Sequence, residues 1–199
     1  MKAADRTRKR PGGRSARVRD AVLKAAFEVL TEIGVENLTI AEVAARAKVH
    51  ETSIYRRWGS RRSLILDASL RATEGAIPVP DTGSLRSDLV TLIGRAAKML
   101  DTPQGRAILA LMQLHDEESL RAKREFWRRR FERLQPIFDR AVARGEFPRD
   151  ADPIILLQVL IAPLWFRLSV TGETLDDWPV ADLVDRLLSR HIKAADSRS

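Results

Sequence analysis

Three observations predict an all-α protein with two domains. Apolar residues recur at helical spacing along most of the 199 residues, and no segment alternates polar and apolar residues like a half-buried strand. The segment GAIPVPDTG concentrates two prolines and two glycines between helical patterns. A hydrophobic content of 44% with 31% charged residues is typical of a globular protein. We expect an N-terminal domain over 15–74, a linker over 75–83 and a larger helical domain over 84–199.

The chain opens with a basic segment, MKAADRTRKRPGGR, that contains one proline and two glycines. We expect residues 1–14 to form a disordered arm, and no apolar segment follows that would complete a signal peptide. Arms of this kind lie along phosphates or enter the minor groove in other DNA-binding domains. The alternative is an unstructured tail that adds only weak electrostatic attraction.

The N-terminal domain is expected to begin with a helix over about 15–33. Gly34 follows it at the position where a C-cap favours glycine. The apolar face of this helix comprises Val18, Val22, Ala25, Ala26, Val29, Leu30 and Ile33. We expect that face to carry the short helices that follow.

The segment 39–61 predicts two short helices, a tight turn and the start of a longer helix. Thr39 and Glu42 have the spacing of a capping box, so a helix should begin there. The next helix, about 50–58, turns Ile54 and Trp58 to one side and is too short to be stable alone. Its outward groups are those of Thr52, Ser53, Tyr55, Arg56 and Arg57.

An outward face of this composition is typical of a helix that reads the DNA major groove. A guanidinium group can bond guanine bidentately, and hydroxyl groups can bond phosphates or base edges. Ser60 then caps a helix with Arg61 and Arg62 in its first turn, where the helix dipole favours acidic side chains. A phosphate docked at that N-terminus would make this placement favourable. The alternative is a solvated helix face.

The run AEVAARAKVHETSIYRRWGSRRSL resembles the helix-turn-helix signature of TetR-type (tetracycline-repressor-like) transcriptional regulators. The resemblance covers roughly residues 15–70 and is most specific at SIYRRWGS. It implies a homodimeric repressor of double-stranded DNA with an effector domain, and phosphate contacts by Tyr55 and Arg61. The candidate DNA contacts are Thr39, His50, Thr52, Ser53, Tyr55, Arg56, Arg57 and Arg61.

Two positions depart from the family pattern. Lys48 stands at the turn position where the family usually has glycine, which tolerates positive φ as lysine does not. His50 and Glu51 stand where the family usually has serine followed by a small or basic residue. Glu51 either accepts a hydrogen bond from a cytosine amino group or only caps the helix start.

The excess positive charge is confined to the N-terminal third of the chain. Residues 1–62 hold 15 Lys and Arg against 7 Asp and Glu, whereas the remaining residues hold 20 of each. A localised basic region indicates a nucleic-acid partner, because phosphate neutralisation releases condensed counterions.

The C-terminal domain is expected to consist of further helices, of which 154–166, IILLQVLIAPLWF, is the most apolar. Thirteen residues are too few to cross a bilayer core of about 30 Å, so we expect a buried helix and no membrane partner. A helix that is apolar nearly all round must be covered on every side, and a second copy of the chain can supply part of that cover. The candidate dimer residues are Ile155, Val159, Leu160, Leu183 and Leu187.

Large aromatic and thioether side chains predict an effector pocket in the same domain, because they pack irregularly and often line apolar ligand sites. A filled core with the same residues is the alternative. The run Arg128–Arg130 lies among glutamates, and we interpret it as a solvated face.

Few charged residues lie among the candidate pocket residues, so we expect an apolar or aromatic effector. The candidate pocket residues are Met99, Met112, Trp127, Phe131, Phe138 and Trp165.

Enzymatic function has little support in the sequence. The chain has no cysteine, and its histidines, His50, His115 and His191, lack the partners of a helical metal site. No phosphate-binding glycine loop or nucleophile elbow occurs, so we expect no cofactor, no catalytic residue and a cytoplasmic location. Two functions remain: a ligand-responsive repressor of a palindromic operator, and a constitutive or architectural dimeric DNA-binding protein without an effector.

Overall fold

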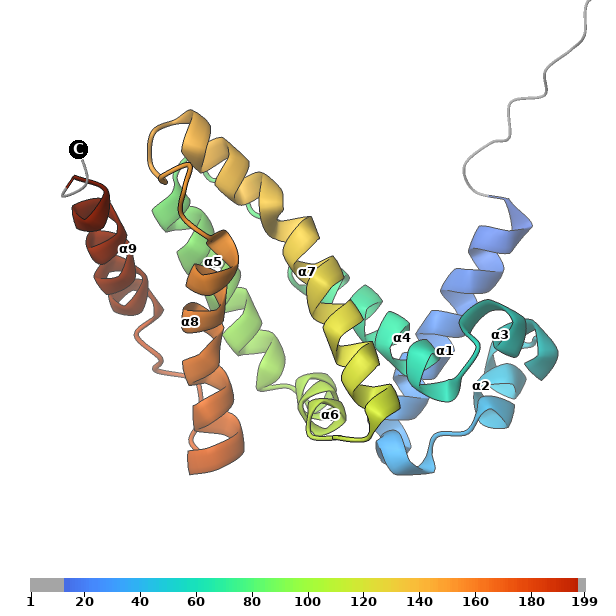
Figure 1. Cartoon of the computed structure of the whole chain (residues 1–199). Helices are drawn as coiled ribbons and strands as arrows, with labels where there is room; N and C mark the ends of the chain where they lie inside the picture. Colours follow the sequence, from blue (N-terminus) through green and yellow to red (C-terminus); the bar gives the residue numbers. More distant parts are fainter. Residues whose placement is uncertain (1–12, 197–199) are drawn as a thin grey trace, which may run out of the picture. The chain divides into compact units, whose positions relative to one another are not determined.

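The computed structural model describes residues 13–196, which contain helices and no strand, as the sequence predicts (Figure 1). The predicted arm lies outside the described residues except for its last two positions. The helices are α1 (Arg14–Asn37), α2 (Ile40–Ala47), α3 (Glu51–Trp58), α4 (Arg61–Ala76), α5 (Leu85–Leu100), α6 (Pro103–Met112), α7 (Glu117–Ala143), α8 (Pro153–Phe166), the π-helical turn η1 (Arg167–Thr171) and α9 (Val180–Asp196).

The chain divides into two compact units between Ala68 and Ser69, which is a position inside α4. The sequence instead places the boundary at 75–83. Part of that segment is fixed within the second unit, because the Asp88 carboxylate accepts hydrogen bonds from the N–H and the hydroxyl of Thr82, both at 2.7 Å. The prolines and glycines of this segment therefore end α4 and form a turn that is anchored on α5.

The core of the first unit is built on α1. Most of the predicted apolar face is buried, but Val18 and Ile33 are 36% and 43% exposed. Gly34 explains the second difference, since its φ of 79° and ψ of 169° interrupt the helix before the last turn. The interruption redirects the chain so that Val35, rather than Ile33, is buried.

The turn between α2 and α3 has the strained residue that the sequence predicts. Thr39 caps α2 by accepting a hydrogen bond from the N–H of Glu42 at 3.1 Å. Lys48 ends α2 with a φ of 56° and a ψ of 47°, the left-handed region that glycine adopts most readily. Among the described residues, Lys48 is the only residue other than glycine with a positive φ. This turn sets the direction in which α3 leaves α2.

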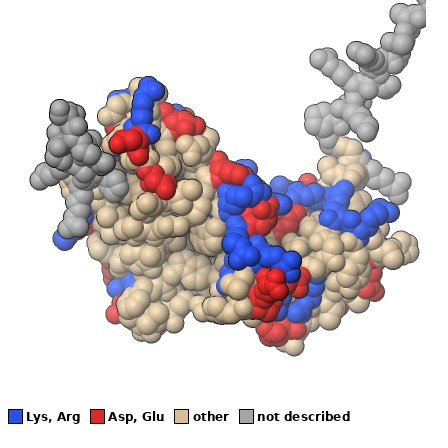
Figure 2. Space-filling view, viewed as in Figure 1, with Lys and Arg blue, Asp and Glu red and all other residues tan. Residues whose placement is uncertain are grey.

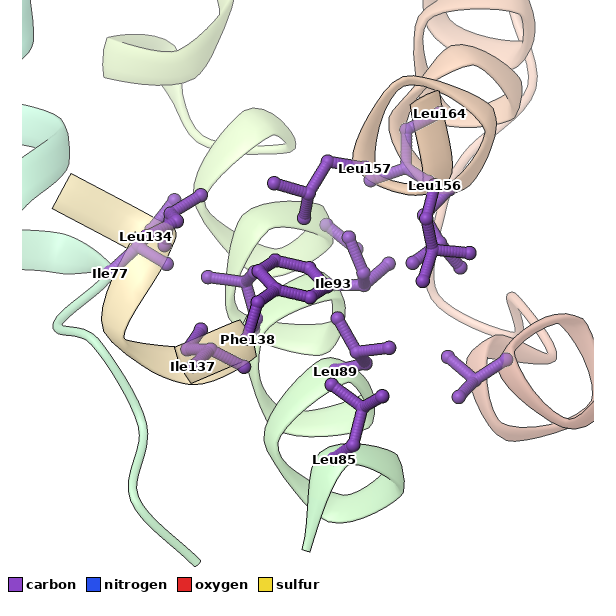
Figure 3. Close-up of a cluster of buried hydrophobic side chains, with 14 of the residues drawn as sticks. Ile77, Leu85, Leu89, Ile93, Leu134, Ile137, Phe138, Leu156, Leu157 and Leu164 are labelled. Atoms are coloured by element: carbon purple, nitrogen blue, oxygen red, sulfur yellow. The ribbon is translucent and has the colours of Figure 1, made fainter. Parts of the chain in front are cut away.

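The core of the second unit lies among α5, α7, α8 and α9. Leucine and isoleucine side chains of α5 meet Phe138 of α7 and the leucines of α8 (Figure 3). Phe138 also contacts Phe147, with their ring centroids 5.2 Å apart. The labelled side chains that converge here include Leu89, Ile93, Leu134, Ile137, Phe138, Leu156 and Leu157.

The most apolar helix, α8, continues into η1 and is buried on one side only. Together they span 19 residues, Pro153–Thr171, and by length and composition alone could cross a membrane. The helix is thus longer than the thirteen residues counted in the sequence. Leu156, Leu157, Leu160 and Leu164 are buried in the core of the second unit. Its exposed apolar residues are Ile154, Ile155, Val159, Phe166 and Val170.

Candidate DNA-binding surface and effector cavity

The outward face of α3 is fixed in place by the residues on its inner side. Ile54 is buried, and the indole N–H of Trp58 donates to the Asp67 carboxylate at 3.0 Å. The same carboxylate oxygen accepts a hydrogen bond from Arg19 at 2.9 Å, so α1, α3 and α4 are joined at one point. A helix of eight residues is too short to be stable alone, so its position depends on this packing and these hydrogen bonds to other helices.

Some of the groups that α3 directs outward form no side-chain bond with any described residue. Thr52, Tyr55 and Arg56 are exposed, as are His50 and Glu51 at the start of the helix. Among the described residues, Arg56 has no hydrogen-bond or ion-pair partner. A guanidinium in this state can form bidentate bonds to a guanine edge without first breaking a contact inside the protein.

Two of the predicted DNA contacts, Arg57 and Arg61, are occupied by bonds within the first unit. Arg57 donates to the hydroxyl of Ser15 at 2.7 Å, and its guanidinium lies 5.8 Å from the centre of the Trp58 ring. Arg61 donates to three backbone carbonyls after the break in α1, the shortest being 2.8 Å to Leu38. Both arginines therefore support the position of α3 and α4, and their predicted contacts with DNA remain predictions.

The arginine run on α7 divides between surface and interior. Arg128 and Arg129 form ion pairs with Glu125, and basic and acidic side chains lie next to one another on the surface over α7 (Figure 2). Hydrogen bonds from both arginines lower the pKa of Glu125 to about 2. Arg130, in contrast, is 6% exposed, so the interpretation of the whole run as a solvated face is wrong for this residue.

A cavity that is partly open to solvent lies inside the second unit. Four of the six predicted pocket residues line it: Met99, Met112, Trp127 and Trp165. Phe138 does not, because it is buried in the core against Phe147. Phe131 does not either, and it stacks on Trp127 with their ring centroids 5.5 Å apart. The other lining residues are Thr73, Ile77, Leu92, Ile93, Ala96, Leu100, Ile108, Phe126, Arg130, Leu134 and Ile161.

Sequence reasoning missed Arg130, although its spacing contained a usable signal. Arg130 lies four residues after Phe126 and four before Leu134, both of which are buried on the inner face of α7. Helical periodicity thus places Arg130 on the inner face, whereas its neighbours Arg128 and Arg129 point outward. Three consecutive arginines suggest that all three are exposed, but consecutive residues of a helix point in different directions.

The predicted dimer residues differ in their exposure within one chain. Ile155 and Val159 are exposed on α8, whereas Leu183 and Leu187 of α9 are half-buried against the core. Leu160 is 0% exposed and belongs to the core of its own unit, so its prediction as an interface residue is wrong. The hydrophobicity of α8 does not distinguish its two faces, because nearly every position is apolar.

Two family models match the chain. Residues 22–68 match "Bacterial regulatory proteins, tetR family", and residues 79–187 match "Tetracyclin repressor-like, C-terminal domain". The HTH-type transcriptional regulator AqdR of Rhodococcus erythropolis is 36% identical over 149 residues, which cover 74% of this chain and 72% of that protein.

Other relatives extend the similarity over most of both chains. The DNA-binding transcriptional repressor TetR of Mycobacteroides abscessus is 34% identical over 174 residues, covering 84% of this chain and 90% of that protein. A crystal structure of the TetR family transcription regulator SCO0332 superposes with a TM-score of 0.76 at 30% sequence identity, covering 87% of this chain and 97% of the other.

Proposed function

The chain belongs to the TetR family of DNA-binding transcriptional regulators, and we propose that it is a repressor released from a palindromic operator by a small molecule. It is a non-enzymatic transcription factor, and regulators of this family bind DNA, dimerise and bind small-molecule effectors. It acts in the cytoplasm, as TetR-type regulators of bacteria do. The observation that carries the proposal is an exposed reading helix in one unit and an apolar cavity in the other.

In this proposal the operator is read by α3. Arg56 contacts a base edge, with Thr52, Ser53 and Tyr55 beside it on phosphates or bases. Thr39, at the start of α2, and His50, at the start of α3, complete the surface, since backbone N–H groups at helix starts favour phosphate. The positive charge of residues 1–62 adds attraction that does not depend on DNA sequence.

In this proposal, the effector releases the protein from DNA by changing the position of α4, the helix that both units share. Its first half buries Leu64 and Ile65 in the first unit, and Thr73 in its second half lines the cavity. An effector lowers operator affinity only if it prefers a position of α4 that DNA binding disfavours. A tenfold loss of affinity requires about 1.4 kcal/mol of coupling.

The palindrome follows from a homodimer that buries the exposed side of α8. Ile155, Val159, Phe166 and Val170 recur at intervals of four or seven residues, so they form a stripe along α8 and η1. A two-fold dimer presents two copies of α3, and half-sites of such dimers lie roughly 34–36 Å apart or at multiples of that distance.

Selection of bound fragments from random DNA tests the proposal. The expected result is a palindromic site, protected in footprinting, whose affinity falls when a compound that thermally stabilises the protein is added. Salt-sensitive binding to every DNA sequence with equal affinity would instead support the constitutive or architectural alternative. Compounds that bind the cavity and leave operator affinity unchanged would also favour that alternative.

A further inference from the structure

We propose that the effector is a small organic acid whose carboxylate pairs with Arg130 while its apolar body occupies the cavity. This inference rests on the proposed effector function and specifies the chemical class of the ligand. Among the fifteen described residues that line the cavity, Arg130 is the only charged one. The apolar lining alone predicts an apolar or aromatic compound, and Arg130 adds a requirement for negative charge.

The guanidinium of Arg130 is buried with poor hydrogen bonding. Its two terminal nitrogens both donate to the carbonyl of Ile77, each at 3.4 Å. Bonds of this type are usually about 2.7 to 3.2 Å long, so both are at the weak end of the range. Among the described residues, no carboxylate lies within 4.0 Å of an Arg130 nitrogen. Buried charges in proteins are normally paired, so this one is an exception.

The charges around Arg130 do not compensate for its burial. Glu74 forms an ion pair with Arg133 at 3.5 Å and is not in ion-pair contact with Arg130. Desolvation lowers the pKa of Arg130 to about 10, the positive charge of Arg133 acts in the same direction, and Glu74 opposes them. The side chain is still a cation at neutral pH, so the cavity wall carries a positive charge that lacks a close counterion.

A carboxylate on the ligand would supply that counterion. The planar guanidinium matches a carboxylate in a bidentate pair, and hydrogen bonds between two charged groups are shorter and stronger than neutral ones. Arg130 is already desolvated in the ligand-free protein, so only the ligand carboxylate loses its water on binding. A neutral ligand leaves the buried cation without a counterion, and a cationic ligand is repelled.

The apolar part of the ligand has matching surroundings. Trp127 and Trp165 supply aromatic surface, and Met99 and Met112 supply flexible thioethers that adapt to the shape of the ligand. Phe131 stacks behind Trp127 and holds its ring from outside the cavity. The expected effector is therefore an amphiphile with one acidic group and a compact apolar body.

The test compares acids with their neutral amides by isothermal titration calorimetry on the full-length protein. The probes are 2-naphthoate with 2-naphthamide, and octanoate with octanamide. At least one acid should bind about 10- to 100-fold more tightly than its amide, the range expected for hydrogen bonds to a charged group. Equal affinities in both pairs overturn the assignment of Arg130 but leave the cavity as an effector site. Absence of binding by any probe overturns it and also counts against the effector function.

Two variants connect the preference to Arg130. Arg130→Met should abolish the preference for the acid while retaining affinity for the amide, because methionine fills the space without a charge. Its fold is expected to persist, since apolar replacement of a buried charge is often neutral or stabilising. Arg124→Met is the matched control: it removes the same charge from an exposed position of α7 and should keep the preference. If Arg130→Met still prefers the acid, Arg130 is not its partner.

Discussion

At the scale of single residues, the function of the first unit depends on which side chains are bonded to other residues of the chain and which are available to contact DNA. Arg56 and Arg57 are neighbours on α3, yet Arg57 is bonded to Ser15 and Arg56 has no partner among the described residues. A helix that reads DNA needs both kinds of residue, because the first fixes its orientation and the second contacts the bases.

Replacement of these two arginines should therefore have different effects. Arg56→Ala is expected to weaken binding to the selected operator by about 1–3 kcal/mol and to relax preference at one base position. Arg57→Ala should lower the thermal unfolding temperature and weaken binding to all sequences without changing preference. Binding measurements on the operator and on each single-base variant separate the two effects. If Arg56→Ala leaves the base preference intact, α3 is oriented differently on DNA.

Lys48 leads to a stability prediction at the same scale. A left-handed conformation costs a residue other than glycine about 1–2 kcal/mol. Glycine avoids this cost but loses more conformational entropy on folding than lysine does, so the net gain is smaller. Lys48→Gly should thus stabilise the protein by about 0.5–1 kcal/mol in denaturant unfolding. Lys24→Gly, in the middle of α1, is the control and should destabilise it by about 1 kcal/mol. A lower unfolding midpoint for Lys48→Gly would show that the lysine conformation carries no strain.

At the scale of elements, α8 combines a buried face and an exposed apolar face, and we propose the exposed face as the dimer interface. Its leucines belong to the core of their own chain, whereas Phe166 and Val170 are 57% and 69% exposed. A charge at Leu160 would therefore unfold the chain and would not report on dimerisation. The exposed stripe provides the informative position.

Phe166→Glu is expected to yield a folded monomer, because an exposed charge costs little in one chain but is buried in the dimer. Gln158→Glu is a control on the exposed part of the same helix, outside the stripe, and should remain dimeric. Sedimentation equilibrium at micromolar concentration measures both, and circular dichroism verifies the fold. A dimeric Phe166→Glu protein would place the interface elsewhere, and a monomeric wild-type protein would remove the palindromic operator.

At the scale of the whole molecule, charge distribution determines how binding responds to salt. The excess of basic residues lies in 1–62, and residues 1–12, outside the described range, hold five Lys and Arg against one Asp. If this segment lies on phosphates, its deletion should reduce the slope of log K against log salt by about 0.9 for each phosphate that it neutralises. Fluorescence anisotropy over a salt series measures the slope. An unchanged slope would support the tail that contributes only weak attraction.

Whether a helix has one apolar face or is apolar nearly all round decides which of the predictions from sequence succeeded. Local periodicity predicted the inner face of α3 through Ile54 and Trp58, because a short helix has one strongly apolar side. It could not divide α8 into a core face and an exposed face, since the helix is apolar nearly all round. Phe138 and Met112 are both large apolar residues at helical spacing. Only the packing of α5, α7 and α8 decides that Phe138 fills the core and Met112 lines the cavity.

If the proposed acid pairs with the buried guanidinium of Arg130, exposure to the effector also changes the lifetime of the protein. A poorly paired internal cation destabilises the ligand-free chain, and an acid that pairs with it stabilises the folded state in proportion to its concentration. Intracellular proteases degrade chains that unfold, so abundance follows folding stability. Cells that accumulate the acid would then hold more of the regulator, in a form released from DNA. On depletion of the acid, this enlarged stock would reoccupy the operator without new synthesis, and transcription would stop sooner than after the first exposure.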